Sequence, residues 1–212
     1  MKNKEKAIAI YNCLKKEYPN ASCTLQFVNE LELLIATRLS AQCTDERVNI
    51  ITKSLFSKYR EIEDYAFCDI EELENIIKPC GFYHIKAKSI NEMCKTLIEK
   101  YKGKIPNSME QLLTLQGIGR KSANLILGEV FKKPAIVTDT HCIRLSNRLG
   151  LCKSVNPLFV ERTLKKIVPD EISLDFCHLL VYHGRAICNA KKPKCLNCCI
   201  NFLCEYYLNS LY

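Results

Sequence analysis

The sequence predicts an all-α protein, and two observations support this fold class. Apolar residues recur at intervals of three and four along most of the 212-residue chain, which places them on one face of successive helices. No run of alternating apolar and polar residues is long enough to predict a β-strand. We therefore expect about ten short helices, each near the average length of ~11 residues.

The expected helices lie between recognisable start and stop signals. The first carries a stripe from Ala7 to Leu14 that Pro19 closes, and the very apolar segment 27–39 predicts a buried helix. Later helices start at N-capping residues, whose side chains accept from the first free amides: Thr44, Asp69, Ser108, Asp139 and Asn156. They end at prolines and glycines, which do not continue a helix: Pro79, Gly103, Gly150 and Gly184.

Charge and composition limit the possible functions. The formal net charge of +8, from 31 basic and 23 acidic side chains, favours a polyanionic partner, although many proteins are mildly basic. No stretch reaches the ~20 apolar residues that a bilayer span needs. The first twelve residues lack the apolar core of a signal peptide. We therefore expect a cytoplasmic protein without a membrane span.

The segment LTLQGIGRKSANLIL (113–127) places two glycines between two apolar helical patterns. Gly117 and Gly119 allow a tight turn, and a helix that opens there presents free N–H groups at its positive end. Such a helix start binds anions, and for a basic protein the natural anion is a nucleic-acid phosphate. For an isolated G-x-G, however, a simple turn between two helices is the more common explanation.

Lys121 lies in the first turn of that second helix, where the dipole disfavours its ammonium form. A neutral amine is a nucleophile that can form a Schiff base, although most lysines are only surface charges.

Asp139, in the segment VTDTHCIRLSNRLG (137–150), has two compatible interpretations. It can cap a helix, worth ~1 kcal/mol, and it can stabilise positive charge developing on a sugar near Lys121. Arg144 and Arg148 share one helix face and either meet phosphates or face solvent.

Four of the fourteen cysteines form a compact C-x6-C-x2-C-x5-C pattern: Cys188, Cys195, Cys198 and Cys204. Four thiolates so close in sequence indicate a metal site. Zinc is the default metal, but structural zinc usually uses two C-x2-C pairs, so this spacing slightly favours an iron–sulfur cluster. The adjacent Cys199 is expected to be a bystander, and the other cysteines to be small buried hydrophobes. Lys191, Lys192 and Lys194 lie inside the cysteine loop and either grip phosphates or are solvated.

Together these motifs resemble the endonuclease III family of helix-hairpin-helix DNA glycosylases. The matching segments, in the family's order, are LSAQCTD (39–45), GFYHIKA (81–87), LQGIGRKSAN (115–124), TDTH (138–141), HGR (183–185) and the cysteine loop. The resemblance therefore extends over nearly the whole chain.

The resemblance implies a bifunctional glycosylase and AP lyase that acts on oxidised pyrimidines and carries a [4Fe-4S] cluster on the four cysteines. In the family, the lysine matched by Lys121 attacks C1′ of a flipped nucleotide, and β-elimination of the Schiff base nicks the strand. The aspartate matched by Asp139 assists. Gln42 matches the residue that faces the orphaned base, and Phe82 matches an apolar wedge.

The implied fold has two helical lobes. Residues 22–133 correspond to a helical barrel that carries the hairpin, and residues 1–21 with 134–212 to the iron–sulfur lobe. The implied partner is duplex DNA containing oxidised bases or abasic sites, bound by a nucleoid-associated monomer. The expected DNA contacts are Gln42, Phe82, Gly117, Gly119, Arg120, Arg144, Arg185, Lys191, Lys192 and Lys194.

The chain departs from the family pattern at three positions. Gln116 replaces a proline common in the hairpin, Phe82 is bulkier than the expected leucine, and Leu113 stands where an acidic residue is expected. Two alternatives stay open. A monofunctional adenine or mismatch glycosylase would share the fold but lack the hairpin lysine. A non-catalytic metal-containing DNA-binding protein would leave Lys121 and Asp139 without a role.

Overall fold

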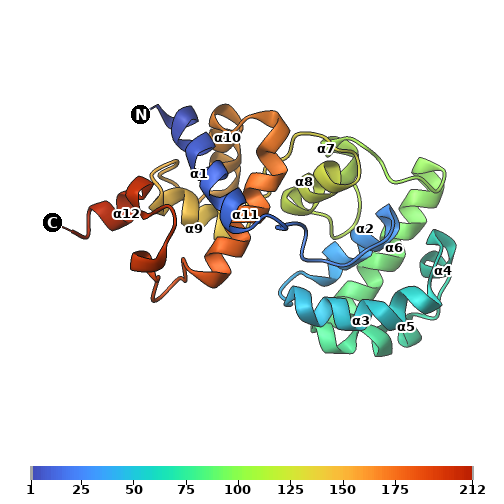
Figure 1. Ribbon diagram of the computed structural model, residues 1–212. Coiled ribbons are helices and arrows are strands. Elements are labelled where there is room, and N and C mark those ends of the chain that lie inside the picture. Colours follow the sequence, from blue (N-terminus) through green and yellow to red (C-terminus); the bar gives the residue numbers. More distant parts are fainter. Residues whose placement is uncertain (1, 212) are drawn as a thin grey trace. The chain divides into compact units, whose positions relative to one another are not determined.

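A computed structural model describes residues 2–211, and every regular element in that range is a helix (Figure 1). The α-helices are α1 (Asn3–Glu17), α2 (Glu30–Leu39), α3 (Asp45–Lys58), α4 (Ile62–Ala66), α5 (Ile70–Ile77), α6 (Tyr83–Tyr101), α7 (Met109–Leu112), α8 (Arg120–Glu129), α9 (Thr140–Arg148), α10 (Pro157–Ile167), α11 (Ser173–Ala186) and α12 (Glu205–Leu208). Short 3-10 turns are η1 (Lys78–Cys80), η2 (Asp170–Ile172), η3 (Cys195–Asn197) and η4 (Asn201–Leu203). The all-α prediction is confirmed.

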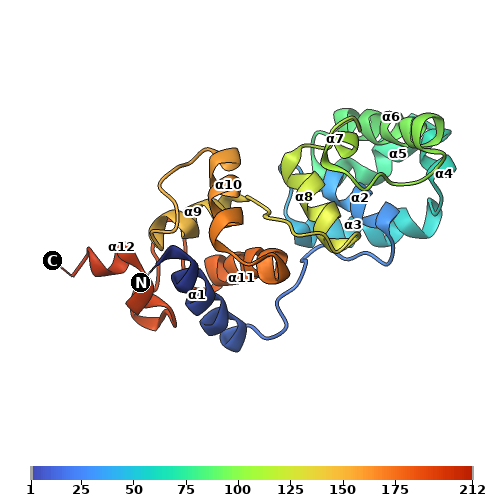
Figure 2. The ribbon, with the colours of Figure 1, turned by 90° about the horizontal axis from the view of Figure 1, so that it is seen from above.

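The chain folds into two compact units. The first is the continuous segment Cys23–Lys132, which contains α2 to α8. The second joins the N-terminal segment through Ser22 to the segment that begins at Lys133. Within this second unit, α1 packs beside α10 and α11, which lie far from it in sequence (Figure 2).

Helix α2 is the central rod of the first unit. Five of its ten residues have no exposed surface: Leu33, Leu34, Ile35, Ala36 and Leu39. The helix begins at Glu30, three residues after the expected start, because the side chain of Asn29 accepts from the amide of Glu32 at 2.9 Å and fixes the N-cap there. Helices α3, α6 and α8 all pack against α2. The core of this unit therefore holds the hairpin helix α8 in place.

The five expected N-caps are all present. In each, a side-chain oxygen accepts from an amide of the first helical turn: Thr44, Asp69, Ser108, Asp139 and Asn156. The predicted stop at Gly184 is wrong, because α11 continues to Ala186. A Cβ at Gly184 would lie 2.5 Å from Nδ1 of His141 and 3.1 Å from Nη2 of Arg144. This glycine therefore permits close packing against α9 and does not end the helix.

Among residues 2–211, no helix is long and apolar enough to cross a bilayer.

Candidate functional site

The hairpin turn lies between the short helix α7 and helix α8. Leu115 and Ile118 turn inward, 2% and 5% exposed, and anchor the loop in the core. The amide of Ile118 donates to the carbonyl of Leu115 at 3.1 Å, which closes the turn. Gly117 adopts φ +81°, a left-handed conformation that strains any other L-residue. A Cβ there would also collide with the side chain of Arg38, so the turn requires glycine for two reasons.

Helix α8 starts without a side-chain cap. Gly119 is its N-cap residue and has no side chain with which to accept from the first-turn amides. Within residues 2–211, the backbone amides of Gly119 and Lys121 donate to no protein acceptor. Free amides at the positive end of a helix dipole form an anion site. The sequence expectation of a phosphate-binding hairpin therefore has the required geometry.

Lys121 is the second residue of α8 and is exposed. Its positive charge acts on the thiol of Cys23, whose pKa is raised to about 12, mainly by burial, with the lysine opposing that shift. The carboxylates of Asp45 and Glu129 act on the same thiol in the opposite direction. Lys121, Asp45 and Glu129 therefore all act on the same thiol in the first unit, and the amine itself lies on an accessible surface.

Asp139 belongs to the second unit, where it is half-buried at the start of α9. Its Oδ1 accepts from the amide of Cys142 at 2.6 Å, so the capping role expected from the sequence is present. The cap orients the carboxylate and uses one of its two oxygens. Because the carboxylate is fixed and its second oxygen is not used by the cap, it is also suited to stabilising positive charge.

Gln42 and Phe82 are exposed residues in strained loop conformations. Both have left-handed backbones, with φ of 54° and 49°. Phe82 is 60% exposed and precedes α6, and Gln42 lies in the loop after α2. Non-glycine residues held at positive φ cost free energy and are concentrated at functional sites. The sequence resemblance selected both residues, and the structure shows that both loops present them to solvent.

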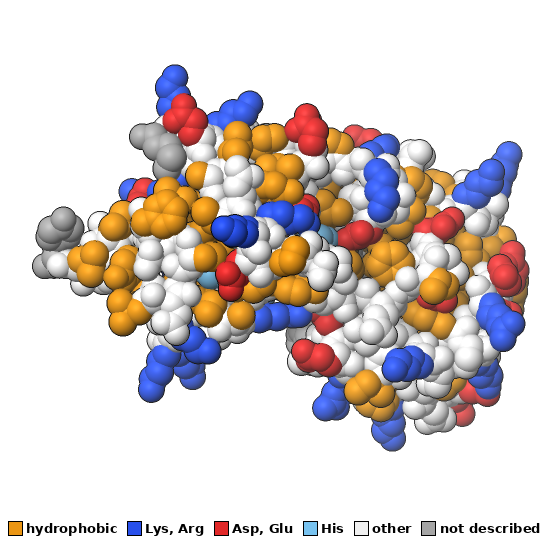
Figure 3. All heavy atoms as spheres, in the orientation of Figure 1, with side chains coloured by type: hydrophobic (Ala, Val, Ile, Leu, Met, Phe, Trp, Pro, Cys, Tyr) orange, Lys and Arg blue, Asp and Glu red, His pale blue; other side chains and the backbone are white. Residues whose placement is uncertain are grey.

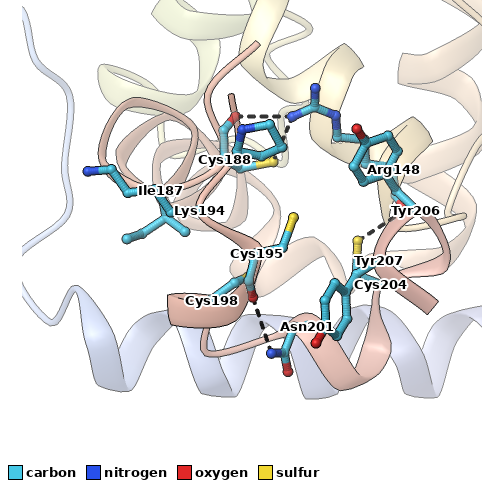
Figure 4. Close-up of a pocket in the computed structure, with 11 residues that line it drawn as sticks. Arg148, Ile187, Cys188, Lys194, Cys195, Cys198, Asn201, Cys204, Tyr206 and Tyr207 are labelled. Carbon is cyan, nitrogen blue, oxygen red and sulfur yellow. Dashed lines mark hydrogen bonds between the residues drawn. The ribbon is translucent and has the colours of Figure 1, made fainter. Parts of the chain in front are cut away.

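The four cysteines line one cavity in the second unit, whose empty space of about 280 Å³ is partly open to solvent (Figure 4). The thiols of Cys188, Cys195 and Cys204 point into this common space. Cys199 lies instead near Glu17 and Cys13 of α1. Among residues 2–211, no three His, Cys, Asp or Glu side chains have the spacing of a site for a single metal ion. The donor set is therefore grouped but spread around a hollow.

Two arginines of α9 hold the cysteine loop. Arg144 donates to the carbonyl of Cys188 at 3.0 Å and to that of Gly184 at 3.1 Å. Arg148 donates to Sγ of Cys188 at 3.2 Å and to the carbonyls of Asn189 and Ala190, each at 2.8 Å. Hydrogen bonds from cations to thiolate ligands are the usual outer contacts of a metal site. From the sequence, both arginines were expected only to meet phosphates or to face solvent, and nothing in the sequence paired them with the cysteine loop.

His183 also contacts the loop. Its Nε2 lies 3.1 Å from Sγ of Cys198, and its Nδ1 lies 3.1 Å from the hydroxyl of Tyr18. Burial lowers the pKa of this imidazole to about 4. The motif HGR had drawn attention to this segment, but nothing in the sequence paired His183 with a particular cysteine.

The basic residues of the cysteine loop face solvent. Lys191, Lys192, Lys194 and the nearby Arg185 are all exposed. Figure 3 shows basic side chains gathered over the segment between α11 and α12. Lys194 donates to the carbonyl of Ala186, the last residue of α11, at 3.4 Å. The charges of Lys191, Lys192 and Lys194 are available to a polyanion, whereas Arg144 uses its donors within the protein.

These features, a glycine turn, an uncapped basic helix and a helical scaffold, define a class of protein. Residues 35–170 match the HhH-GPD superfamily of base excision DNA repair proteins. Endonuclease III of Synechocystis sp. is 46% identical over 202 residues, covering 95% of this chain and 92% of the relative. Endonuclease III of Escherichia coli is 39% identical over 204 residues, covering 96% and 97%. The chain belongs to the endonuclease III family.

Solved structures agree with this assignment. A non-covalent complex of endonuclease III with DNA matches with a TM-score of 0.93 and 42% identity, over 100% of this chain and 99% of that one. A trapped covalent endonuclease III–DNA intermediate matches with a TM-score of 0.93 and 41% identity, over 100% of both chains. A thermostable thymine-DNA glycosylase, at 23% identity and a TM-score of 0.86, covers 97% of this chain and 98% of its own and shares the fold.

Proposed function

We propose that this protein is a bifunctional DNA glycosylase and AP lyase that removes oxidised pyrimidines from duplex DNA in base excision repair. The main structural support for this function is the position of Lys121. Its amine is exposed in the first turn of the hairpin helix α8, which has no side-chain cap. The family assignment supports it, because a structure of endonuclease III holds a covalent DNA intermediate. A purely DNA-binding module would give this amine no task.

In the proposed reaction, the neutral amine of Lys121 attacks C1′ of the extruded nucleotide, and the bond from C1′ to the base breaks. The base leaves with a proton, the C1′–O4′ bond of the sugar then breaks as O4′ takes up a proton, and the amine and C1′ form a Schiff base. Loss of a C2′ proton then expels the 3′ phosphate by β-elimination, which nicks the strand. Asp139 stabilises the positive charge that develops on the sugar and assists the proton transfers.

DNA is held through its phosphates. The free amides of Gly119 and Lys121 receive one phosphate, and exposed cations extend the contact. In this proposal, Gln42 faces the orphaned base and Phe82 enters the stack. The other expected DNA contacts are Gly117, Arg120, Arg144, Arg185, Lys191, Lys192 and Lys194. Arg144 stays a prediction, since the structure shows its donors directed at the cysteine loop.

We also propose that the four lining cysteines hold a [4Fe-4S] cluster. The donor set fits this group, because it is all thiol, surrounds one cavity and receives a hydrogen bond from Arg148. A cluster distributes its four ligands over four irons, which suits donors spread around a hollow better than one zinc ion does. Base excision transfers no electrons, so such a group would serve by fixing the loop that carries Lys191, Lys192 and Lys194.

In this scheme, residues 22–133 form the hairpin domain, and residues 1–21 with 134–212 form the cluster domain. We expect a monomer that acts on chromosomal DNA in the cytoplasm, because a single chain supplies every proposed group.

Borohydride trapping on a duplex containing thymine glycol tests the proposed reaction. Reduction of the Schiff base should leave a covalent protein–DNA adduct with the wild type and none with Lys121→Ala. DNA binding and thermal unfolding of that variant should be unchanged, because the side chain of Lys121 is exposed. A monofunctional glycosylase would release the base without an adduct. A DNA-binding module would bind the duplex and release nothing.

A further inference from the structure

Lys86 is a buried cation in the first turns of α6. Its side chain is among the largest in the protein with almost no exposed surface, 1%. Its Nζ donates to the carbonyl of Leu39 at 2.7 Å and to the carbonyl of Cys80 at 2.9 Å. Burial lowers the pKa of this ammonium. Within residues 2–211, no carboxylate lies in ion-pair contact with it.

The two carbonyls belong to the starts of two different loops. Leu39 is the last residue of α2 and lies three positions before Gln42. Cys80 is the last residue of η1 and lies two positions before Phe82. The last carbonyls of a helix receive no hydrogen bond from within the helix. A cation near them is also favoured by the helix dipole. One ammonium group therefore links the bases of both loops.

Both loops need such a support. Gln42 and Phe82 hold left-handed backbones, and a strained conformation persists only where its surroundings over-determine it. Both side chains are exposed, so their own packing does not fix them. The hydrogen bonds of Lys86 hold the backbone just before both residues and so restrain the distance between the two loops.

A simple core role explains Lys86 poorly. Burying an ammonium without a carboxylate costs free energy, and an apolar side chain of similar size would fill the same space. A buried charge in that position is better explained by the geometry that it enforces. The alternative role, filling the core, predicts that a methionine would serve equally well.

The same turn of α6 also reaches the hairpin. Ser89 Oγ donates to the backbone carbonyl of Lys86 at 3.0 Å and accepts from Nε of Arg38 at 2.5 Å. The side chain of Arg38 in turn lies directly against Gly117. Lys86, Ser89 and Arg38 thus connect three segments of the first unit: the Gln42 loop, the Phe82 loop and the hairpin turn.

We propose that Lys86 is a positioning residue for base extrusion, which sets the Gln42 and Phe82 loops so that both side chains enter the DNA at one base pair. This inference rests on the proposed function for its setting. It predicts a defect in the steps that need inserted side chains, and a smaller defect where the base is already absent.

The test compares Lys86→Met, Lys86→Arg and the control Lys95→Met. Lys95 lies on the same helix, has a side chain that is 41% exposed and forms an ion pair with Glu92. Single-turnover excision of thymine glycol should fall at least about tenfold in Lys86→Met, since misplacing catalytic groups by about 1 Å can cost 100-fold. β-Elimination at a preformed abasic site should fall less, and binding of undamaged duplex should not change. Lys86→Arg, which can donate to both carbonyls, should recover excision.

A second readout does not depend on catalysis. A 2-aminopurine placed opposite an abasic site brightens when side chains disturb the stack, and Lys86→Met should weaken that signal while Lys95→Met should not. If the wild type fails to excise thymine glycol but still shows this signal, the proposed function fails and the positioning role stands. Two results would overturn the inference. In the first, Lys86→Met matches Lys95→Met in every readout. In the second, Lys86→Met reduces all steps equally and loses folded protein, and Lys86→Arg does not recover excision.

Discussion

Replacing Gly117 by alanine tests the hairpin geometry most sharply. The left-handed backbone costs an L-residue about 1–2 kcal/mol. The new Cβ would also displace Arg38, whose Nε bond to Ser89 is worth about 1.5–3 kcal/mol because the donor is charged. Alanine reduces the freedom of the unfolded chain, which returns about 0.4–1 kcal/mol. We therefore expect Gly117→Ala to lower the free energy of unfolding by about 3 kcal/mol.

Urea denaturation measures this loss, and two further variants separate its causes. Gly119→Ala is the matched control, since its φ is −97° and no atom lies within 4 Å of its added Cβ. It should cost less than about 1 kcal/mol. Adding Arg38→Ala to Gly117→Ala should cost less than the sum of the single changes, because the collision disappears. Equal effects of the two glycine variants, or strict additivity with Arg38→Ala, would refute this account of the turn.

Three further predictions concern the site. Asp139→Asn keeps a good N-cap, so its free energy of unfolding should lie within about 0.5 kcal/mol of the wild type. Its turnover on thymine glycol should fall at least about 100-fold. Unchanged turnover would leave Asp139 with its capping role alone. Lys191→Ala and Lys192→Ala should each reduce the slope of log Kd against log salt by about 0.9, as one lost phosphate contact does, and an unaltered slope would mean that the loop is merely solvated. The purified protein should be brown and contain iron and sulfide, and Cys198→Ala should lose both; bound zinc without sulfide would exclude the cluster.

Local features of this fold were predictable from the sequence. The N-caps at Thr44, Asp139 and Asn156 need only a side chain and an amide three residues on, so a short segment determines them. The hairpin turn was predictable for the same reason, since Gly117 and Gly119 act within one loop. The all-α class, the family and the activity agree with the comparisons.

Features set by tertiary packing were not predictable. Gly184 has the sequence pattern of a helix end, and only the contact with His141 shows why a glycine is needed inside α11. Lys86 reads as an ordinary surface lysine until the fold buries it against the carbonyls of Leu39 and Cys80. Arg148 has the same ambiguity, because its partners lie about forty residues away in the cysteine loop. A single sequence specifies such partners only through the complete fold.

Peptide mapping of the borohydride-reduced adduct tests the central claim directly. After digestion, mass spectrometry should find the reduced sugar on the side chain of Lys121, in the peptide that follows the hairpin turn. An adduct on another lysine, or complete excision of thymine glycol with no adduct, would contradict the claim that this amine forms the covalent bond to DNA.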